Sequence, residues 1–127
     1  MSVVLSEIQD FPWYTTTVLA ASATFTGAWK RVHYIPLSTE TEIPVSMPWA
    51  RYVSGLVMAD QTGTVRVDQS NDGTTVHFRE SFVVGIGLAN AVGFLRRIYG
   101  SWVRVTYVND ATLQGSFSLF ALVINGV

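Results

Sequence analysis

The sequence predicts an all-β protein, an antiparallel two-sheet β-sandwich or jelly roll of about eight strands. The first observation is the stretch 64–78, in which Val65 and Val67 alternate with polar residues before Asn71-Asp72-Gly73 reverses the chain and the alternation resumes towards Phe78. Patterning with a period of two on both sides of such a turn is typical of a β-hairpin. The second observation is that similar alternation returns at hairpin spacing over most of the chain.

Residues 1–14 are rich in apolar side chains but show no clean strand period, and Pro12 interrupts them. We therefore separate them as an N-terminal arm from a single β-sandwich domain over residues 15–127. One interpretation of the arm is a strand or short helix that covers one end of the barrel. The other is a segment that docks onto a neighbouring subunit, because a free apolar terminus promotes aggregation.

The sandwich begins with β-branched residues that predict strands over 15–19 and 23–29. Gly27 interrupts the second of these strands and indicates a bulge or a close backbone approach. The pattern then breaks over residues 32–48, where three prolines flank a polar run. This composition predicts one long proline-rich loop, and loops of this length are often functional or disordered.

Further strands are predicted at 51–59, 80–86, 102–108 and 113–123. Alternate apolar residues define a core face in the last three: Phe82, Val84 and Ile86, then Val103, Val105 and Tyr107, then Leu113, Phe117, Leu119 and Ala121. Residues 88–98 fit a helical period as well as a strand period. Gly93 weakens the helix, and the surrounding pattern favours a strand.

The amino-acid composition limits the kinds of partner that the protein can have. The chain has 127 residues, of which 49% are hydrophobic and only 13% charged, which is more apolar material than one small sandwich easily hides. We interpret the excess as a sign of assembly, although a well-filled core with few charges also fits. The net charge of −1 and the lack of a basic cluster argue against nucleic acid as a partner. No apolar run approaches the ~20 residues that a membrane helix needs, so no membrane association is expected.

No constellation of catalytic or metal-binding residues stands out, so we expect neither an enzyme nor a cofactor. His33 and His77 are far apart in the sequence and have no ligand partner at a suitable spacing. Residues 68–73 resemble the first half of a calcium loop, but Arg79 occupies the position where the loop needs a bidentate glutamate. The sequence predicts a hairpin turn with Asp68 and His77 on its solvent-exposed face.

The candidate site residues are apolar and aromatic side chains of the arm and of the proline-rich loop. As a hypothesis, we assign the subunit or partner interface to Leu5, Ile8, Phe11, Trp13, Tyr14, Tyr34 and Trp49. An alternative is that Trp and Tyr residues form a stacking platform for sugar rings, with Trp49 and Tyr34 as the first candidates. Trp and Tyr are also common in cores and at interfaces, which favours the interface over the platform.

Three phrases carry a resemblance to a known family: Ala20–Trp29, Gly63–Val76 and Trp102–Asn109. Together they resemble, over about residues 17–123, small β-sandwich structural proteins of tailed bacteriophage virions, such as capsid decoration, head-fibre or tail-associated proteins. The resemblance implies a non-enzymatic virion protein, made in the host cytoplasm, that decorates the capsid or attaches to the head. It implies that the partners are other virion proteins. It also implies that the chain forms a homo-oligomer, for which we expect a trimer. The alternative is a carbohydrate-binding or host-recognition module of a tail or fibre.

Overall fold

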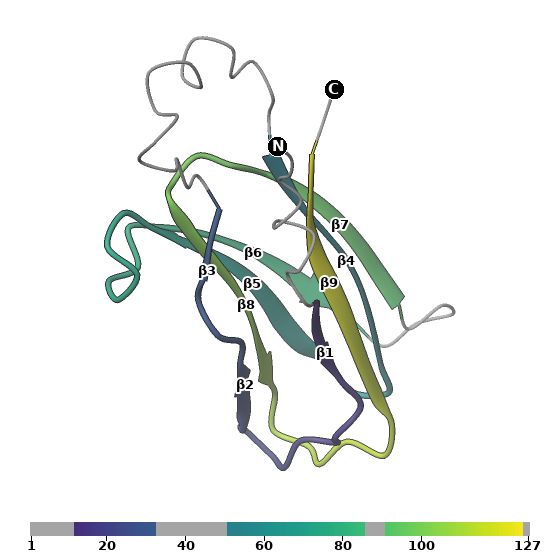
Figure 1. The fold of residues 1–127 in the computed structure, drawn as a ribbon. Coiled ribbons are helices and arrows are strands. Elements are labelled where there is room, and N and C mark those ends of the chain that lie inside the picture. The colour runs from purple at the N-terminus through teal and green to yellow at the C-terminus, as the bar shows by residue number, and fades with distance from the viewer. Residues whose placement is uncertain (1–11, 33–50, 86–90, 126–127) are drawn as a thin grey trace, which may run out of the picture.

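The computed structural model describes residues 12–32, 51–85 and 91–125. In these ranges the chain forms nine strands in two antiparallel sheets, which confirms the predicted β-sandwich (Figure 1). The segment for which helix and strand both remained open is a strand over Ala91–Ile98. None of the described residues belongs to a helix that is long and apolar enough to cross a membrane.

Sheet A has four strands in the order β1-β9-β4-β7. They are β1 (Trp13–Thr15), β9 (Phe117–Asn125), β4 (Arg51–Ala59) and β7 (Ala91–Ile98). The central strand β4 pairs with β9 from Arg51↔Asn125 to Ala59↔Phe117, and with β7 along its other edge. The strand β1 lies at the outer edge of β9, so it begins two residues inside the segment expected to be an arm.

Sheet B has the order β2-β8-β5-β6, with β3 also paired to β8. Its strands are β2 (Thr24–Thr26), β3 (Lys30–Arg31), β8 (Trp102–Asn109), β5 (Gly63–Ser70) and β6 (Phe78–Val84). The predicted hairpin is the pair β5–β6, in register from Gly63↔Val84 to Gln69↔Phe78. The other side of β5 pairs with β8 along its whole length.

The core lies between the sheets and is built from alternate residues of the long strands. The fully buried apolar residues are Val53 and Val57 on β4, Val65 and Val67 on β5, Val84 on β6, Val103, Val105 and Tyr107 on β8, and Leu119 and Ala121 on β9. Most of them are β-branched, because such side chains pack well on a pleated surface that is buried on one side. The predicted core face of β8 is therefore confirmed, as are Phe117, Leu119 and Ala121 on β9 and Phe82 and Val84 on β6, whereas Ile86 is outside the described residues.

One open side of the sandwich is closed by Trp13. Its indole N–H donates a 2.8 Å hydrogen bond to the carbonyl of Ala28, which ties sheet A to the chain between β2 and β3. That chain is held on sheet B by the amide of Gly27, which donates to the Val105 carbonyl at 2.9 Å. A Cβ atom at Gly27 would overlap both the indole and this carbonyl, which confirms the predicted close approach.

The opposite side of the sandwich is closed where β6 and β7 face each other. Phe82 and Phe94 stack with ring centroids 5.7 Å apart. The guanidinium of Arg96 lies 4.4 Å from the centre of the Phe82 ring, and its Nε atom is 3.4 Å from a carboxylate oxygen of Glu80. A stacked pair and a cation–π contact thus join two edge strands that form no hydrogen-bond ladder with each other.

The turn of the hairpin is wider than predicted. Phe78 starts β6 and is 43% exposed, because it lies beyond the end of the core. The loop before it is organised by Asp72, whose carboxylate accepts hydrogen bonds from the backbone N–H groups of Thr74 and Thr75 and from the Ser70 hydroxyl. These local bonds replace ladder bonds, so the alternation in the sequence extends further than the strand does.

Two further expectations about strands are wrong. Leu113 was expected on the core face with Phe117, but β9 starts only at Phe117 and Leu113 is 62% exposed in the preceding turn. The strand predicted at 15–19 ends at Thr15. In both places Gln114 is the reason: its backbone N–H donates to the Leu19 carbonyl, and its side-chain oxygen accepts from the Leu19 N–H. These bonds fix two loops against each other instead of extending two strands.

Candidate functional site

The residues predicted for the interface differ in where the structure places them. Leu5, Ile8, Phe11, Tyr34 and Trp49 lie outside the described residues. Trp13 and Tyr14 are neighbours on β1 and point to opposite sides of sheet A, because successive side chains of a strand alternate. Trp13 is only 4% exposed in the core, so its assignment to an interface is wrong. Tyr14 is 61% exposed and faces outward.

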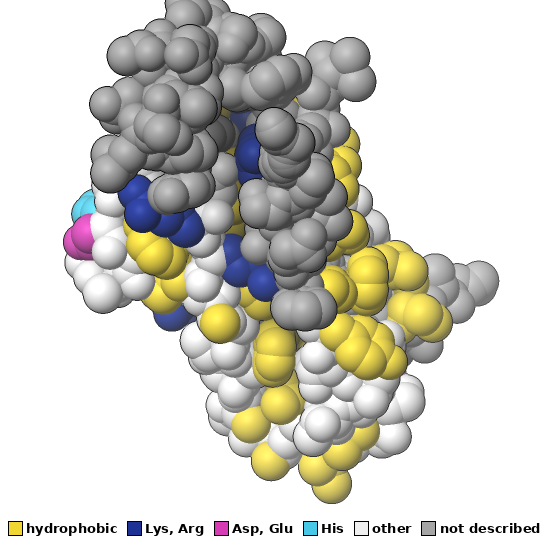
Figure 2. All heavy atoms as spheres, viewed as in Figure 1, with side chains coloured by type: hydrophobic (Ala, Val, Ile, Leu, Met, Phe, Trp, Pro, Cys, Tyr) yellow, Lys and Arg dark blue, Asp and Glu magenta, His cyan; other side chains and the backbone are white. Residues whose placement is uncertain are grey.

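Tyr14 is part of a larger surface that we call the apolar face. It is the outer side of sheet A and is defined by Tyr14, Leu56, Met58, Leu95 and Phe120, each between 42% and 61% exposed. Tyr14 pairs with Phe120 in the register of β1 and β9, and their rings meet edge to face with centroids 6.1 Å apart. Phe120 in turn pairs with Leu56 on β4. Figure 2 shows hydrophobic side chains gathered over β9 and its neighbours in sheet A.

The apolar face carries no charge over three successive rows of paired strand residues. These rows are Tyr14–Phe120–Leu56–Gly93, Leu122–Ser54–Leu95 and Ser118–Met58–Ala91. Gly93 leaves a gap beside Leu56, because a Cβ atom built there would have only the Gly55 carbonyl oxygen, 3.9 Å away, within van der Waals range. An uncharged, apolar sheet face is typical of a surface that is covered in an assembly.

The sequence contains a signal for this face that the prediction did not use. On β4, Leu56 and Met58 alternate with the buried Val57 and Ala59, and on β9 Phe120 follows the buried Leu119. The strands are thus apolar on both sides, where a sheet that faces water on one side shows polar residues at every second position. The interface residues predicted on the arm and on the proline-rich loop do not include Leu56, Met58 or Phe120.

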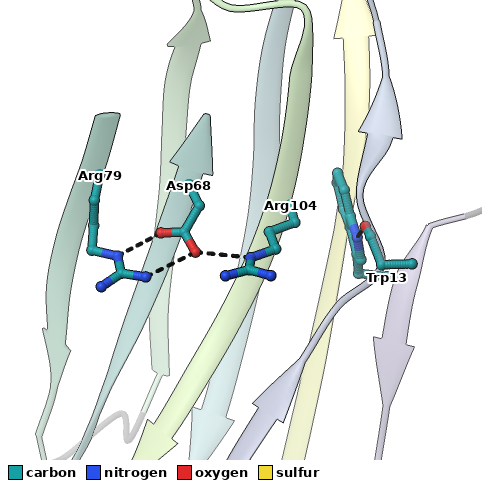
Figure 3. A network of polar contacts seen from close by, with 5 residues as sticks. Trp13, Asp68, Arg79 and Arg104 are labelled. Carbon is teal, nitrogen blue, oxygen red and sulfur yellow. Dashed lines mark hydrogen bonds and ion pairs between the residues drawn. The ribbon is translucent and has the colours of Figure 1, made fainter. Parts of the chain in front are cut away.

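The outer side of sheet B carries a charged network instead. Asp68 on β5 lies between Arg79 on β6 and Arg104 on β8, which are its cross-strand neighbours (Figure 3). Arg79 binds both carboxylate oxygens, at 2.7 and 3.2 Å, and the Nε atom of Arg104 donates at 3.0 Å. The Arg104 guanidinium also lies 4.5 Å from the centre of the Trp29 ring.

Asp68 was expected to be exposed on the wet face of the hairpin, and this is wrong. The side chain points to the outer side of the sheet, but its exposure is 0%, because the two arginines cover it. Three charge-assisted hydrogen bonds occupy three of the roughly four lone-pair sites of the carboxylate, and its oxygens do not reach solvent. The network is therefore best explained as a clamp across three strands.

The clamp makes the stability of the fold depend on pH. Burial by itself raises the pKa of the Asp68 carboxyl, but hydrogen bonds and charges from Arg79 and Arg104 outweigh burial, and its pKa lies below the usual 3.8. The unfolded chain therefore binds the proton at a higher pH than the native protein. The stabilisation from Asp68 is complete above about pH 5 and is lost as the pH falls through the lowered native pKa.

This loss can be measured by comparing urea unfolding curves of the wild type and of Asp68→Asn from about pH 7 to about pH 2. The free energy of unfolding of the wild type should fall more steeply with acidification than that of the variant. The difference between the two curves isolates Asp68 from all other carboxylates. Parallel curves would contradict the assignment.

Among the described residues, no three His, Asp or Glu side chains come close enough together to hold a metal ion. His77 accepts a hydrogen bond from the backbone N–H of Asn71, and the nearby Ser70 hydroxyl donates to the Asp72 carboxylate. His33 lies outside the described residues.

Comparisons with known proteins agree with the fold. A family model described as the N-terminal domain of the uncharacterised protein YqxG matches residues 2–124. A solved structure, the crystal structure of PBSX exported protein XepA, is similar with a TM-score of 0.69 and 19% identity, and the match covers 92% of this chain. The chain spans 38% of the length of that protein.

A second structure, reported under the heading of Bacillus endospore appendages that form disulfide-linked pili, matches 92% of this chain and 88% of its own at 18% identity. Its TM-score of 0.39 is too low to establish a common fold. No curated protein matches the sequence.

Proposed function

The chain belongs to the family of the YqxG N-terminal domain, and from this premise we propose that it is a non-enzymatic structural protein of a phage particle or of a phage-derived particle. The proposal is supported by the fold that the chain shares with the phage-derived exported protein XepA. Within such a particle we assign it the role of a decoration or head-attached protein. Its partners would be copies of itself and a major capsid, head or tail protein.

The observation that carries the proposal is the apolar face. Exposure of this apolar surface to water is unfavourable, so covering it in an assembly lowers the free energy even without a specific hydrogen bond. Its charge-free rows match an interface core, which is depleted of charged residues. A protein that repeats such contacts around a symmetry axis attaches firmly even if each contact is weak.

Assembly through the apolar face predicts that a single charge in its centre separates the subunits. We expect the wild type to sediment as a homo-oligomer and Leu56→Glu to sediment as a monomer of 14.0 kDa. Leu56 is 49% exposed, so the glutamate can reach water in the monomer and the fold should persist, whereas in the oligomer it would be buried without a partner. Analytical ultracentrifugation, with circular dichroism to verify folding, measures both.

The matched control is Val83→Glu. Val83 is 70% exposed on β6, on the outer side of the other sheet, and the same charge there should leave the oligomer intact. A wild type that is monomeric at all accessible concentrations, or a Leu56→Glu variant that assembles like the wild type, would contradict assembly through this face.

The association with a particle needs a separate measurement. Quantitative mass spectrometry of particles purified from the induced host should find this chain at a fixed copy number relative to the major capsid protein. Its absence from such particles would overturn the virion role and leave the assembly result standing on its own.

A further inference from the structure

A small pocket of about 220 Å³ lies at the end of the sandwich where the β5–β6 hairpin meets the turn between β7 and β8. It is lined by Gln69, Ser70, Asn71, His77, Phe78, Tyr99 and Gly100. Its residues belong to sheet B and to the turn that follows β7, and none of them is part of the apolar face. No lysine, arginine or carboxylate is among these lining residues.

The floor of the pocket is rigid. The Gln69 side chain is 1% exposed and makes three hydrogen bonds across the sandwich. Its Nε2 atom donates to the Arg97 carbonyl at 2.9 Å, and its Oε1 atom accepts from the N–H groups of Tyr99 and Gly100 at 2.6 and 3.0 Å. Three of the four hydrogen-bonding positions of this buried amide thus fix the β7–β8 turn against β5, which holds the pocket in one shape.

Two exposed aromatic rings form the walls. Phe78 is 43% exposed and Tyr99 is 71% exposed. Their ring centroids are 6.1 Å apart and their planes are inclined at 80°, so the rings form a corner. The Arg97 guanidinium lies 5.7 Å from the centre of the Tyr99 ring and helps to hold that ring in place. The two rings together leave an aromatic surface open to solvent at the mouth of the pocket.

The polar rim consists of His77 and Asn71. The Nδ1 atom of His77 accepts a 3.1 Å hydrogen bond from the Asn71 backbone N–H, so in the neutral imidazole the proton is on Nε2 and can be donated. The side-chain amide of Asn71 supplies a donor and an acceptor at the same rim. The Ser70 hydroxyl is already engaged by Asp72 and by the N–H of Gly73.

We propose that this pocket binds one pyranose residue of a neutral glycan. A pyranose presents a face of C–H groups, which packs on an aromatic ring, and a periphery of hydroxyl groups, which need donors and acceptors in fixed positions. The corner of Phe78 and Tyr99 offers the ring surface, and the His77 and Asn71 rim offers the hydrogen bonds. The absence of charge from the lining selects a neutral sugar over a charged one. This binding activity is independent of the structural role proposed above.

The experiment is saturation-transfer difference NMR with the methyl glycosides of glucose, galactose and N-acetylglucosamine at millimolar concentration. We expect transfer to the ring protons of at least one of the three, and a dissociation constant about tenfold weaker in Tyr99→Ala. His77→Ala should weaken binding as well, because a hydrogen bond is lost while the aromatic corner stays.

The matched control is Tyr14→Ala, which removes another exposed tyrosine, one that lies on the apolar face, and should bind the sugar as the wild type does. No transfer to any of the three glycosides from folded protein would overturn the proposal, and so would equal binding by the wild type and Tyr99→Ala. The Leu56→Glu variant separates the two proposals, because a monomer that still binds sugar retains the pocket although assembly has failed.

Discussion

Replacing Trp13 by alanine is expected to lower the free energy of unfolding by about 3–5 kcal/mol. The indole is 4% exposed and closes one side of the sandwich. Its N–H group donates a hydrogen bond to the Ala28 carbonyl. The substitution removes the ring from the core, leaves a cavity against Gly27 and deprives the carbonyl of its partner. A loss of this size is a large part of the stability of a small domain.

Two further variants show which interaction of Trp13 is responsible for this loss of stability. Trp13→Phe keeps most of the ring but not the indole N–H, so its loss should be about 1–2 kcal/mol. Tyr14→Ala alters the next residue, which is exposed, and should cost less than about 1 kcal/mol. Urea unfolding followed by circular dichroism at one fixed protein concentration measures all three. A Trp13→Ala variant as stable as Tyr14→Ala would contradict the role of the indole.

The second large effect is expected from Asp68→Asn, at about 2–3 kcal/mol near neutral pH. Asparagine has nearly the same shape but no charge, so Arg79 and Arg104 would remain side by side on the sheet with no counter-charge between them. Both arginines reach water at their ends, which keeps the loss below that of a fully enclosed ion pair. The cross-strand connection from β6 through β5 to β8 would be weakened at its centre.

Asp110→Asn is the matched control for charge. Asp110 is exposed in the turn after β8, and its removal should change stability by no more than about 0.5 kcal/mol. Chemical denaturation of both variants in parallel at pH 7 gives the comparison. Equal stability of Asp68→Asn and the wild type would mean that desolvation of the three charges cancels their attraction.

The fold class was predictable because it depends on local patterns. The alternation of Val103, Val105 and Tyr107 defines the core face of β8 without knowledge of its partners. The pattern could not define where strands end, because ends depend on tertiary hydrogen bonds. Gln114 ends two segments by binding Leu19, a residue distant in the sequence, and no local signal announces that contact.

The candidate site was less predictable than the fold. Aromatic residues draw attention in a sequence, but Trp13 lies in the core while Leu56 and Met58 form part of the apolar face. The environment of Asp68 depends on Arg79 and Arg104, which lie on two other strands. The sequence does not show that these residues are neighbours, because their contact depends on the register in which β6, β5 and β8 pair. The corner of Phe78 and Tyr99 likewise joins residues from two separate turns.

The strand order of sheet A also determines when the protein can fold during its synthesis. The hairpin β5–β6 joins neighbours in the chain and can form as soon as both strands have left the ribosome. In contrast, β1 and β4 have β9 as a partner, so Trp13 meets Ala121 and Arg51 meets Asn125 only after almost all described residues have been translated. Until then the edges of β1 and β4 that will contact β9 remain open, and open strand edges bind other chains. We expect a nascent chain that stops before Phe117 to be the form most dependent on chaperones.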